Sequence, residues 1–280
     1  MASPLRERPD RRSTLSTETC PLSDGRTLAY TTGGDPDGVP VVAHHGTPGS
    51  RLFAALLSAA AADTGVRLLV PDRPGYGRSS SPPRDWTWWA WQHDLTELLR
   101  SESIRRAGVM GFSGGGPFAI AAADSDWASR LALVSTVVPP ADTALVRLSR
   151  VPFAVRLLFR AAKVLAAIRS EPKAIVEQYT DRSVSAAVAR AVADDFHEAL
   201  RQGARAVARE NRSFATDALE PRRLSLPVHA WHGTQDTNTP LSPVRAVMHD
   251  VDGRLSTTET DHLGTLLDCR RDVFEWLSAE

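Results

Sequence analysis

The sequence has no long hydrophobic run, little cysteine and no excess of charge of either sign. No stretch reaches the ~18 uninterrupted apolar residues that a membrane-spanning helix requires, so we expect no association with a membrane. The 33 basic and 33 acidic side chains cancel and form no long single-sign run, which argues against a nucleic-acid partner. The two cysteines, Cys20 and Cys269, lie in no metal-binding spacing. We interpret them as free thiols, although a single disulfide between them stays open.

The first 14 residues lack the pattern of a signal peptide, because they mix charged residues with proline and contain no apolar segment of sufficient length. We therefore expect a disordered tail at residues 1–14 and a cytoplasmic protein. At 280 residues the chain fits one large domain that buries about 75% of the surface its unfolded form exposes. A homodimer stays possible.

From about residue 19, short β-branched runs alternate with longer helical patterns, which is typical of a parallel sheet covered by helices on both faces. The sequence thus predicts an α/β fold. Eight strands are expected, at Thr19–Leu22, Arg26–Thr31, Val41–His45, Arg67–Val70, Ala107–Gly111, Leu131–Val137, Val228–Trp231 and Arg254–Thr258.

The stretch at residues 139–221 interrupts this alternation, since it contains no convincing strand and reads as several helices. We interpret it as a helical lid inserted after the sixth strand, which leaves residues 15–138 and 222–280 as the core. Within it, Arg156, Arg160 and Lys163 recur at helical spacing and form a charged stripe. A solvated face explains this stripe better than a membrane-binding helix does.

The strongest chemical signal is a G-x-S-x-G turn centred on Ser113, which follows an apolar strand and precedes an alanine-rich helix. The turn is so sharp that positions two before and two after the serine must lack bulk, and Gly111 and Gly115 meet this need. Gly114 presents its backbone N–H at the start of the following helix, where an oxyanion would lie. The context predicts that Ser113 is a nucleophile.

Four motifs together resemble the α/β-hydrolase family, and the resemblance covers nearly everything from about residue 20 onward. Besides the serine turn they are a His-Gly loop at His44-His45-Gly46-Thr47, the loop from Asp72 to Ser80, and two strand ends that lead to Asp236 and His262. The resemblance implies an eight-stranded, mostly parallel sheet with flanking helices. It also implies a triad of Ser113, Asp236 and His262, in the chain order that this fold uses.

The His-Gly loop of the family donates a second oxyanion-hole N–H, and the matching residue here is Thr47. The assignment is chemically sound because Thr47 has an N–H to donate, whereas Pro48 has none. In the next loop, Asp72 and Arg73 are interpreted as residues that shape the wall of the site. His44 is interpreted as a strand-end residue rather than a proton carrier.

Two other carboxylates compete with Asp236 for the role of the acid. Asp142 follows the sixth predicted strand, where some members of the fold place it, but it more readily caps the first lid helix. Asp261 is the chain neighbour of His262, so its side chain is expected to point away. Asp236 is preferred over both.

These residues predict a serine hydrolase that cleaves an ester- or amide-like bond of a small, largely apolar molecule. His262 would take the proton of Ser113 and return it to the leaving group, while Asp236 fixes the imidazole tautomer. This chemistry requires neither a metal nor an organic cofactor.

Substrate identity is poorly encoded in the sequence. In the tryptophan-rich run, Trp88 and Trp91 fall on a core-facing stripe, whereas Trp86 and Trp89 could line the mouth of the pocket. Two other functions stay open. One is acyl transfer or cyclisation on the same triad, and the other is ligand binding with a slow or silent triad.

Overall fold

Eight strands form one sheet in the computed structural model, in the order β1-β2-β4-β3-β5-β6-β7-β8. Strand β2 runs opposite to the other seven strands, so the sheet is mostly parallel, as predicted. The strands are β1 (Ser16–Pro21), β2 (Thr27–Gly34), β3 (Val39–His44), β4 (Val66–Pro71), β5 (Ala107–Phe112), β6 (Ala128–Val134), β7 (Val228–Gly233) and β8 (Arg254–Thr258).

The structure describes residues 15–84, 86–151, 153–169, 172–217 and 224–279. The predicted disordered tail at residues 1–14 and the predicted end of the lid at residue 221 lie outside these ranges. Each predicted strand is present, and β6 differs most from its predicted bounds because it ends at Val134 rather than Val137. The cause is local, since Ser135 adopts a left-handed backbone conformation with φ of 44° that a strand cannot continue.

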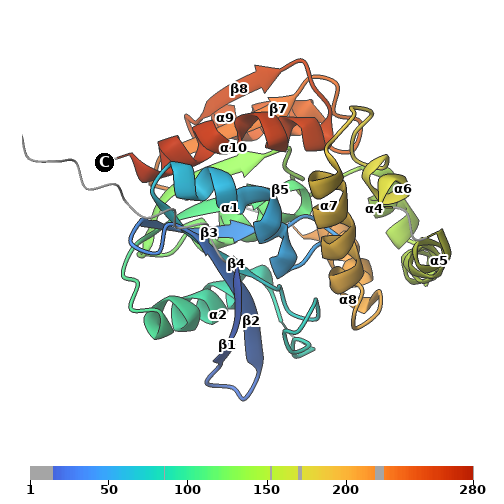
Figure 1. Cartoon of the computed structure of the whole chain (residues 1–280), viewed down its shortest axis with the longest axis horizontal. Helices are drawn as coiled ribbons and strands as arrows, with labels where there is room; N and C mark the ends of the chain where they lie inside the picture. Colours follow the sequence, from blue (N-terminus) through green and yellow to red (C-terminus); the bar gives the residue numbers. More distant parts are fainter. Residues whose placement is uncertain (1–14, 85, 152, 170–171, 218–223, 280) are drawn as a thin grey trace, which may run out of the picture.

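Alternate residues of the central strands pack into two separate cores, one on each face of the sheet. Val41 faces one core and its neighbour Val42 the other, as the two-residue period of a strand requires. Helices α1 (Ala54–Asp63) and α10 (His262–Ser278) cover the first face, while α2 (Trp88–Ser101), α3 (Gly116–Ala123) and α9 (Leu241–Asp250) cover the second (Figure 1). The cysteines are buried free thiols, one in each core.

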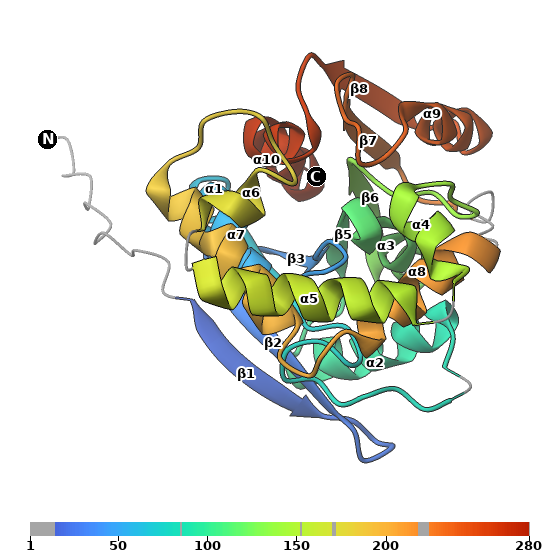
Figure 2. The ribbon, with the colours of Figure 1, turned by 90° about the vertical axis from the view of Figure 1, so that its right-hand side faces the viewer.

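Within the described residues between β6 and β7, five helices are found, and they are called the inserted helices here. Figure 1 shows them gathered at one end of the sheet, and Figure 2, viewed from that end, shows α5 lying across the front of the molecule. Phe196 of α7 and Phe214 of α8 are buried in the cores beneath. The bounds are α4 (Ala144–Ser149), α5 (Ala154–Arg169), α6 (Lys173–Val176), α7 (Ala186–Ala199) and α8 (Arg205–Thr216).

Helix α5 exposes apolar side chains beside its predicted charged stripe. Arg160 is exposed, but Arg156 is partly buried, with its guanidinium carbon 5.5 Å from the ring centroid of Phe153. Leu157 and Val164 are more than half exposed. The outer face of α5 is therefore less polar than the stripe alone indicates. Among the described residues, no helix is long and apolar enough to cross a membrane.

Candidate active site

Ser113 lies at a sharp turn between β5 and α3, with a positive φ of 53° that an L-residue rarely adopts. The turn depends on glycine at both flanking positions. A Cβ added to Gly111 would lie 2.7 Å from the Cβ of Ala119, and one added to Gly115 would lie 2.4 Å from the carbonyl oxygen of His44. The prediction that these positions have no room for a side chain is confirmed.

The loop that carries Thr47 packs directly against the serine turn. A Cβ added to Gly114 would lie 2.3 Å from Thr47 Oγ1, and one added to Gly46 would lie 3.5 Å from the Cβ of Ser113. The Thr47 side chain therefore leaves no room for a side chain at Gly114, whereas Gly46 is at ordinary van der Waals distance from Ser113. This juxtaposition brings the residues predicted to form the oxyanion hole, Thr47 and Gly114, to the same side of the turn.

A buried charged network fixes the side chain of Thr47. Its hydroxyl donates to Glu210 Oε2 at 2.7 Å and accepts from Arg73 Nη2 at 2.8 Å. Arg73 also binds both carboxylate oxygens of Glu210 at 2.9 Å and donates to the carbonyl oxygens of His45 and Gly46. The side chains of Arg73 and Glu210 are at most 2% exposed.

This network connects α8 to the predicted oxyanion loop through charge-assisted hydrogen bonds in a site that excludes water. Arg73 shapes the wall of the site, as predicted. Glu210 was missed by the sequence analysis, since it lies in a charged stretch of α8 that resembles an ordinary solvated helix face.

His262 and Asp236 form the hydrogen-bonded pair that the sequence predicts. His262 Nδ1 lies 2.8 Å from Asp236 Oδ2, and both side chains are buried. The other oxygen, Oδ1, accepts the backbone N–H groups of Asn238 and Thr239. Burial alone would raise the pKa of Asp236, but the bonds from His262 and Thr239 outweigh it and lower the pKa to about 2. The carboxylate is therefore ionised and holds the imidazole in one orientation.

The competing carboxylates lie elsewhere. Asp142 is 69% exposed and pairs with Arg147. It does not cap α4 as predicted, because Thr143 at the helix start supplies the capping oxygen instead. Asp261 caps α10 by accepting from the backbone N–H of Gly264, so it points away from the imidazole of its neighbour, as expected.

His44 is a fully buried strand-end residue, as interpreted from the sequence. Its Nδ1 lies 2.9 Å from the carbonyl oxygen of Met110, and burial lowers its pKa to about 3. A neutral imidazole that faces the core does not carry protons for the site.

A cavity with about 480 Å³ of empty space, partly open to solvent, lies over Ser113 and His262. Most of its walls are apolar, and Tyr179 and Asp195 are the polar side chains that the segment between β6 and β7 adds. The lining residues are Gly46, Thr47, Pro48, Phe53, Leu56, Phe112, Ser113, Tyr179, Val192, Asp195, Phe196, His262 and Leu263.

Neither Trp86 nor Trp89 lines this cavity, so their suggested place at its mouth is wrong. Trp86 stacks on Phe118 with a centroid separation of 6.1 Å, because its segment lies on the face of the sheet that α3 covers. Trp88 and Trp91 are buried in the same core, as predicted. In the part of the chain that the structure describes, no cluster of three histidine, cysteine or acidic residues could hold a metal ion.

Residues 41–275 match the family model described as "Alpha/beta hydrolase family". Among curated proteins, the chain is 31% identical over 243 residues to a non-heme chloroperoxidase from Streptomyces lividans, which spans 80% of this chain and 84% of the relative.

Solved structures share the fold over almost the whole chain. They include a hydrolase from Pseudomonas aeruginosa (22% identity, TM-score 0.73, covering 94% of this chain and 99% of that one) and an esterase from Exiguobacterium antarcticum (18%, 0.71, 94% and 98%). An enol-lactonase from Burkholderia xenovorans is similar at 20% identity and a TM-score of 0.67, covering 94% and 100%. At these identities the likeness concerns the fold.

Proposed function

Because the chain belongs to the alpha/beta hydrolase family, we propose that it is a serine hydrolase that cleaves an ester- or amide-like bond of a small, largely apolar molecule through an acyl-enzyme. The observation that carries the proposal is the 2.8 Å bond from Asp236 to an imidazole that lines the same cavity as Ser113. A serine at a strained turn and such a histidine in the same cavity are the groups that acyl transfer requires.

In the first half of the proposed reaction, Ser113 Oγ attacks the carbonyl carbon of the substrate while His262 Nε2 takes the hydroxyl proton. The C–O or C–N bond of the leaving group then breaks, and His262 returns the proton to the leaving group. Asp236 stabilises the imidazolium that exists between the two proton transfers. Water, deprotonated by the same histidine, then attacks the acyl carbon. The bond from that carbon to Ser113 Oγ breaks, His262 returns the proton to Oγ, and the acid is released.

The negative charge that develops on the carbonyl oxygen would be stabilised by the backbone N–H groups of Thr47 and Gly114. Each such donor contributes roughly 3 kcal/mol to transition-state stabilisation. The close packing of these two residues supports the assignment, as does the network that holds the Thr47 side chain. The apolar cavity walls favour a substrate with an apolar body.

Turnover of short- and medium-chain p-nitrophenyl esters tests the proposal. The wild type is expected to hydrolyse at least one of them, and Ser113→Ala is expected to lose turnover by orders of magnitude with its fold intact, because the oxyanion hole alone gives only residual catalysis. A Ser113→Ala variant with near-normal turnover would contradict the nucleophile assignment. Reaction with a serine-directed reagent but no ester turnover would favour acyl transfer to another acceptor.

The similarity to a relative named as a non-heme chloroperoxidase supports peroxide-dependent chlorination as a second candidate activity. If hydrogen peroxide rather than water attacked the acyl-enzyme, the product would be a peracid. That peracid oxidises chloride to hypochlorite and is itself reduced to the carboxylic acid. Chlorination of a dye that depends on peroxide, a carboxylic ester and Ser113 together would support it, and chlorination independent of Ser113 would exclude it.

A cytoplasmic location is also part of the proposal. The two buried free thiols, Cys20 and Cys269, are compatible with a reducing compartment.

A further inference from the structure

The apolar cavity contains two polar side chains that the proposed chemistry does not use, Tyr179 and Asp195. Both come from the inserted segment, Asp195 from α7 and Tyr179 from the turn after α6. A carboxyl group placed in an apolar wall costs free energy unless it is bonded, and it orients a ligand when it is. The contacts of these two side chains therefore indicate what the cavity binds.

Asp195 is held in one orientation by the loop beside the cavity. Its Oδ1 accepts both the backbone N–H and the hydroxyl of Ser50, each at 2.7 Å. A carboxylate has about four acceptor sites, so two bonds from Ser50 leave capacity for a ligand. Asp195 is partly buried on α7 and lines the cavity, so a ligand in the cavity can reach its carboxylate.

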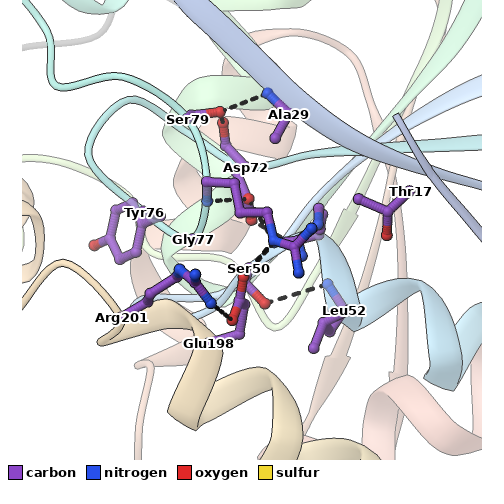
Figure 3. Close-up of polar contacts among 12 residues, drawn as sticks. Thr17, Ala29, Ser50, Leu52, Asp72, Tyr76, Gly77, Ser79, Glu198 and Arg201 are labelled. Atoms are coloured by element: carbon purple, nitrogen blue, oxygen red, sulfur yellow. Dashed lines mark hydrogen bonds and ion pairs between the residues drawn. The ribbon is translucent and has the colours of Figure 1, made fainter. Parts of the chain in front are cut away.

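The charges around Asp195 favour a donor and disfavour an anion. Arg51 Nη1 lies between two other carboxylates, 2.9 Å from Asp72 and 2.6 Å from Glu198. Figure 3 labels these two carboxylates, with Arg201 paired to Glu198. Asp72 and Glu198 thus already balance the charge of Arg51, and Glu198 is also 3.6 Å from Arg78 and from Arg201. Among the described residues Asp195 has no ion pair with a cationic side chain, so its carboxylate accepts from a donor and repels an anion. Burial, with the nearby charge of Asp72, raises the pKa of Asp195 to about 7 against the lowering effect of the Ser50 bonds.

Tyr179 completes the polar part of the wall. Its ring lies 6.5 Å from the ring of His262, close to where the scissile bond is proposed to lie. Burial and the negative charge of Asp195 raise its pKa, so the phenol stays neutral and can donate. Among the described residues, no hydrogen bond to the Tyr179 hydroxyl is found.

We propose that Asp195 and Tyr179 form a specificity subsite that binds a hydrogen-bond-donating group, a hydroxyl or an ammonium, on the non-reacting part of the substrate. The inference rests on the proposed function, since it concerns the substrate of that same cavity. A substrate with an apolar body and one such polar substituent is bound in preference to an apolar or an anionic analogue. A site built around a buried polar group discriminates in this way because an analogue without a donor leaves the polar group of the protein unpaired.

A set of matched esters tests the subsite. The esters differ in one terminal substituent, which is methyl, hydroxyl, ammonium or carboxylate, placed on the acyl or the alcohol side at several chain lengths. For each ester, kcat/KM is measured at pH 8.5, where Asp195 is mostly ionised, and is divided by the kcat/KM of the methyl ester of the same length. The wild type is expected to prefer the best hydroxyl or ammonium ester by about tenfold over methyl, and to disfavour carboxylate.

Asp195→Asn is the decisive variant, because its Oδ1 can keep both Ser50 bonds while an NH₂ group replaces the second oxygen. In this variant the preference for the ammonium ester over the methyl ester is expected to fall about tenfold. The preference for the hydroxyl ester is expected to fall less, since a hydroxyl can accept a hydrogen bond from the new amide. Asp194→Asn, at an exposed position of the same helix, is the matched control and is expected to keep the wild-type ratios. Selective loss of the ammonium preference identifies a cationic ligand, and equal loss of both preferences identifies a general donor site.

Tyr179→Phe provides a second variant that leaves the Ser50 contacts untouched, and it decides the question if Asp195→Asn does not fold. The preference of this variant for the hydroxyl ester over the methyl ester is expected to fall about threefold. Ratios that match the wild type in the folded variants would overturn the subsite. Labelling of Ser113 by a fluorophosphonate in the same preparations separates the two proposals. Labelled enzymes with unchanged ratios refute only the subsite, whereas an unlabelled, inactive wild type refutes the proposed function.

Discussion

Replacing Glu210 with glutamine tests whether the inserted helices position the oxyanion loop. The substitution keeps the shape of the side chain but leaves the guanidinium of Arg73, whose side chain is 0% exposed, without its charge partner. Breaking a buried pair in this way costs roughly 3–5 kcal/mol of unfolding free energy. The neutral amide can retain some bonds to Arg73 and Tyr76, so we expect a loss near the lower end, about 3 kcal/mol.

The effect on catalysis comes through Thr47. Glu210 accepts the Thr47 hydroxyl at 2.7 Å, and Arg73 binds both the same hydroxyl and the carbonyl oxygen of Gly46. A small displacement of this loop misaligns one proposed oxyanion donor, whose complete loss would cost about 10²–10³ in kcat. Partial misalignment is expected to lower kcat about tenfold with little change in KM, because the donor acts mainly in the transition state.

Urea unfolding followed by circular dichroism and steady-state hydrolysis of a p-nitrophenyl ester measure the two effects. Glu198→Gln is the control, since Glu198 also joins α7 to the core through Arg51 but makes no contact with Thr47. It is expected to lower stability while leaving kcat close to that of the wild type. A Glu210→Gln variant with wild-type kcat, or equal kcat losses in both variants, would refute a positioning role.

Three further predictions follow from the geometry. Asp236→Asn is expected to lower turnover by up to ~10⁴ by favouring the wrong imidazole tautomer, while Asp142→Asn is nearly harmless, and the reverse outcome in parallel assays would move the acid to β6. Gly114→Ala places a Cβ 2.3 Å from Thr47 Oγ1, so kcat is expected to fall about 10²-fold, and a fully active variant would disprove the close approach of the two loops. Because the native pKa of Asp195 is raised from 3.8 to about 7, the native state binds this proton more tightly than the unfolded state. Stability should therefore decline as pH rises from 4 to 7 more steeply in the wild type than in Asp195→Asn, and parallel urea midpoints would contradict this.

The sheet and the serine turn were predictable because their signals are local, whereas the Asp236–His262 pair was predicted from the resemblance to the α/β-hydrolase family. A strand that ends in G-x-S-x-G requires small residues around Ser113, and the contacts of Gly111 and Gly115 confirm it. The two-residue alternation of the strands likewise sorts their side chains onto two faces. Such features depend on neighbours in the chain, so the sequence contains them directly.

The walls of the site were not predictable, because they depend on where the inserted helices settle. Glu210 and Asp195 look like ordinary polar residues of amphipathic helices, yet they bind Thr47 and Ser50 across more than a hundred residues of sequence. Trp86 is the opposite case. Its aromatic character suggested a ligand surface, whereas packing against Phe118 places it on the other side of the sheet. Long-range docking, rather than residue type, decides which side chains meet the substrate.

The most direct test of the account is the site of covalent modification by a fluorophosphonate. The reagent phosphonylates only a serine whose proton a neighbouring base removes, so it reports the nucleophile and its activation together. Intact-mass measurement and peptide mapping are expected to find one adduct per wild-type chain, on Ser113, and none in Ser113→Ala. Modification of the Ser113→Ala variant, or an unmodified wild type that still hydrolyses esters, would contradict the claim that Ser113 is the activated nucleophile.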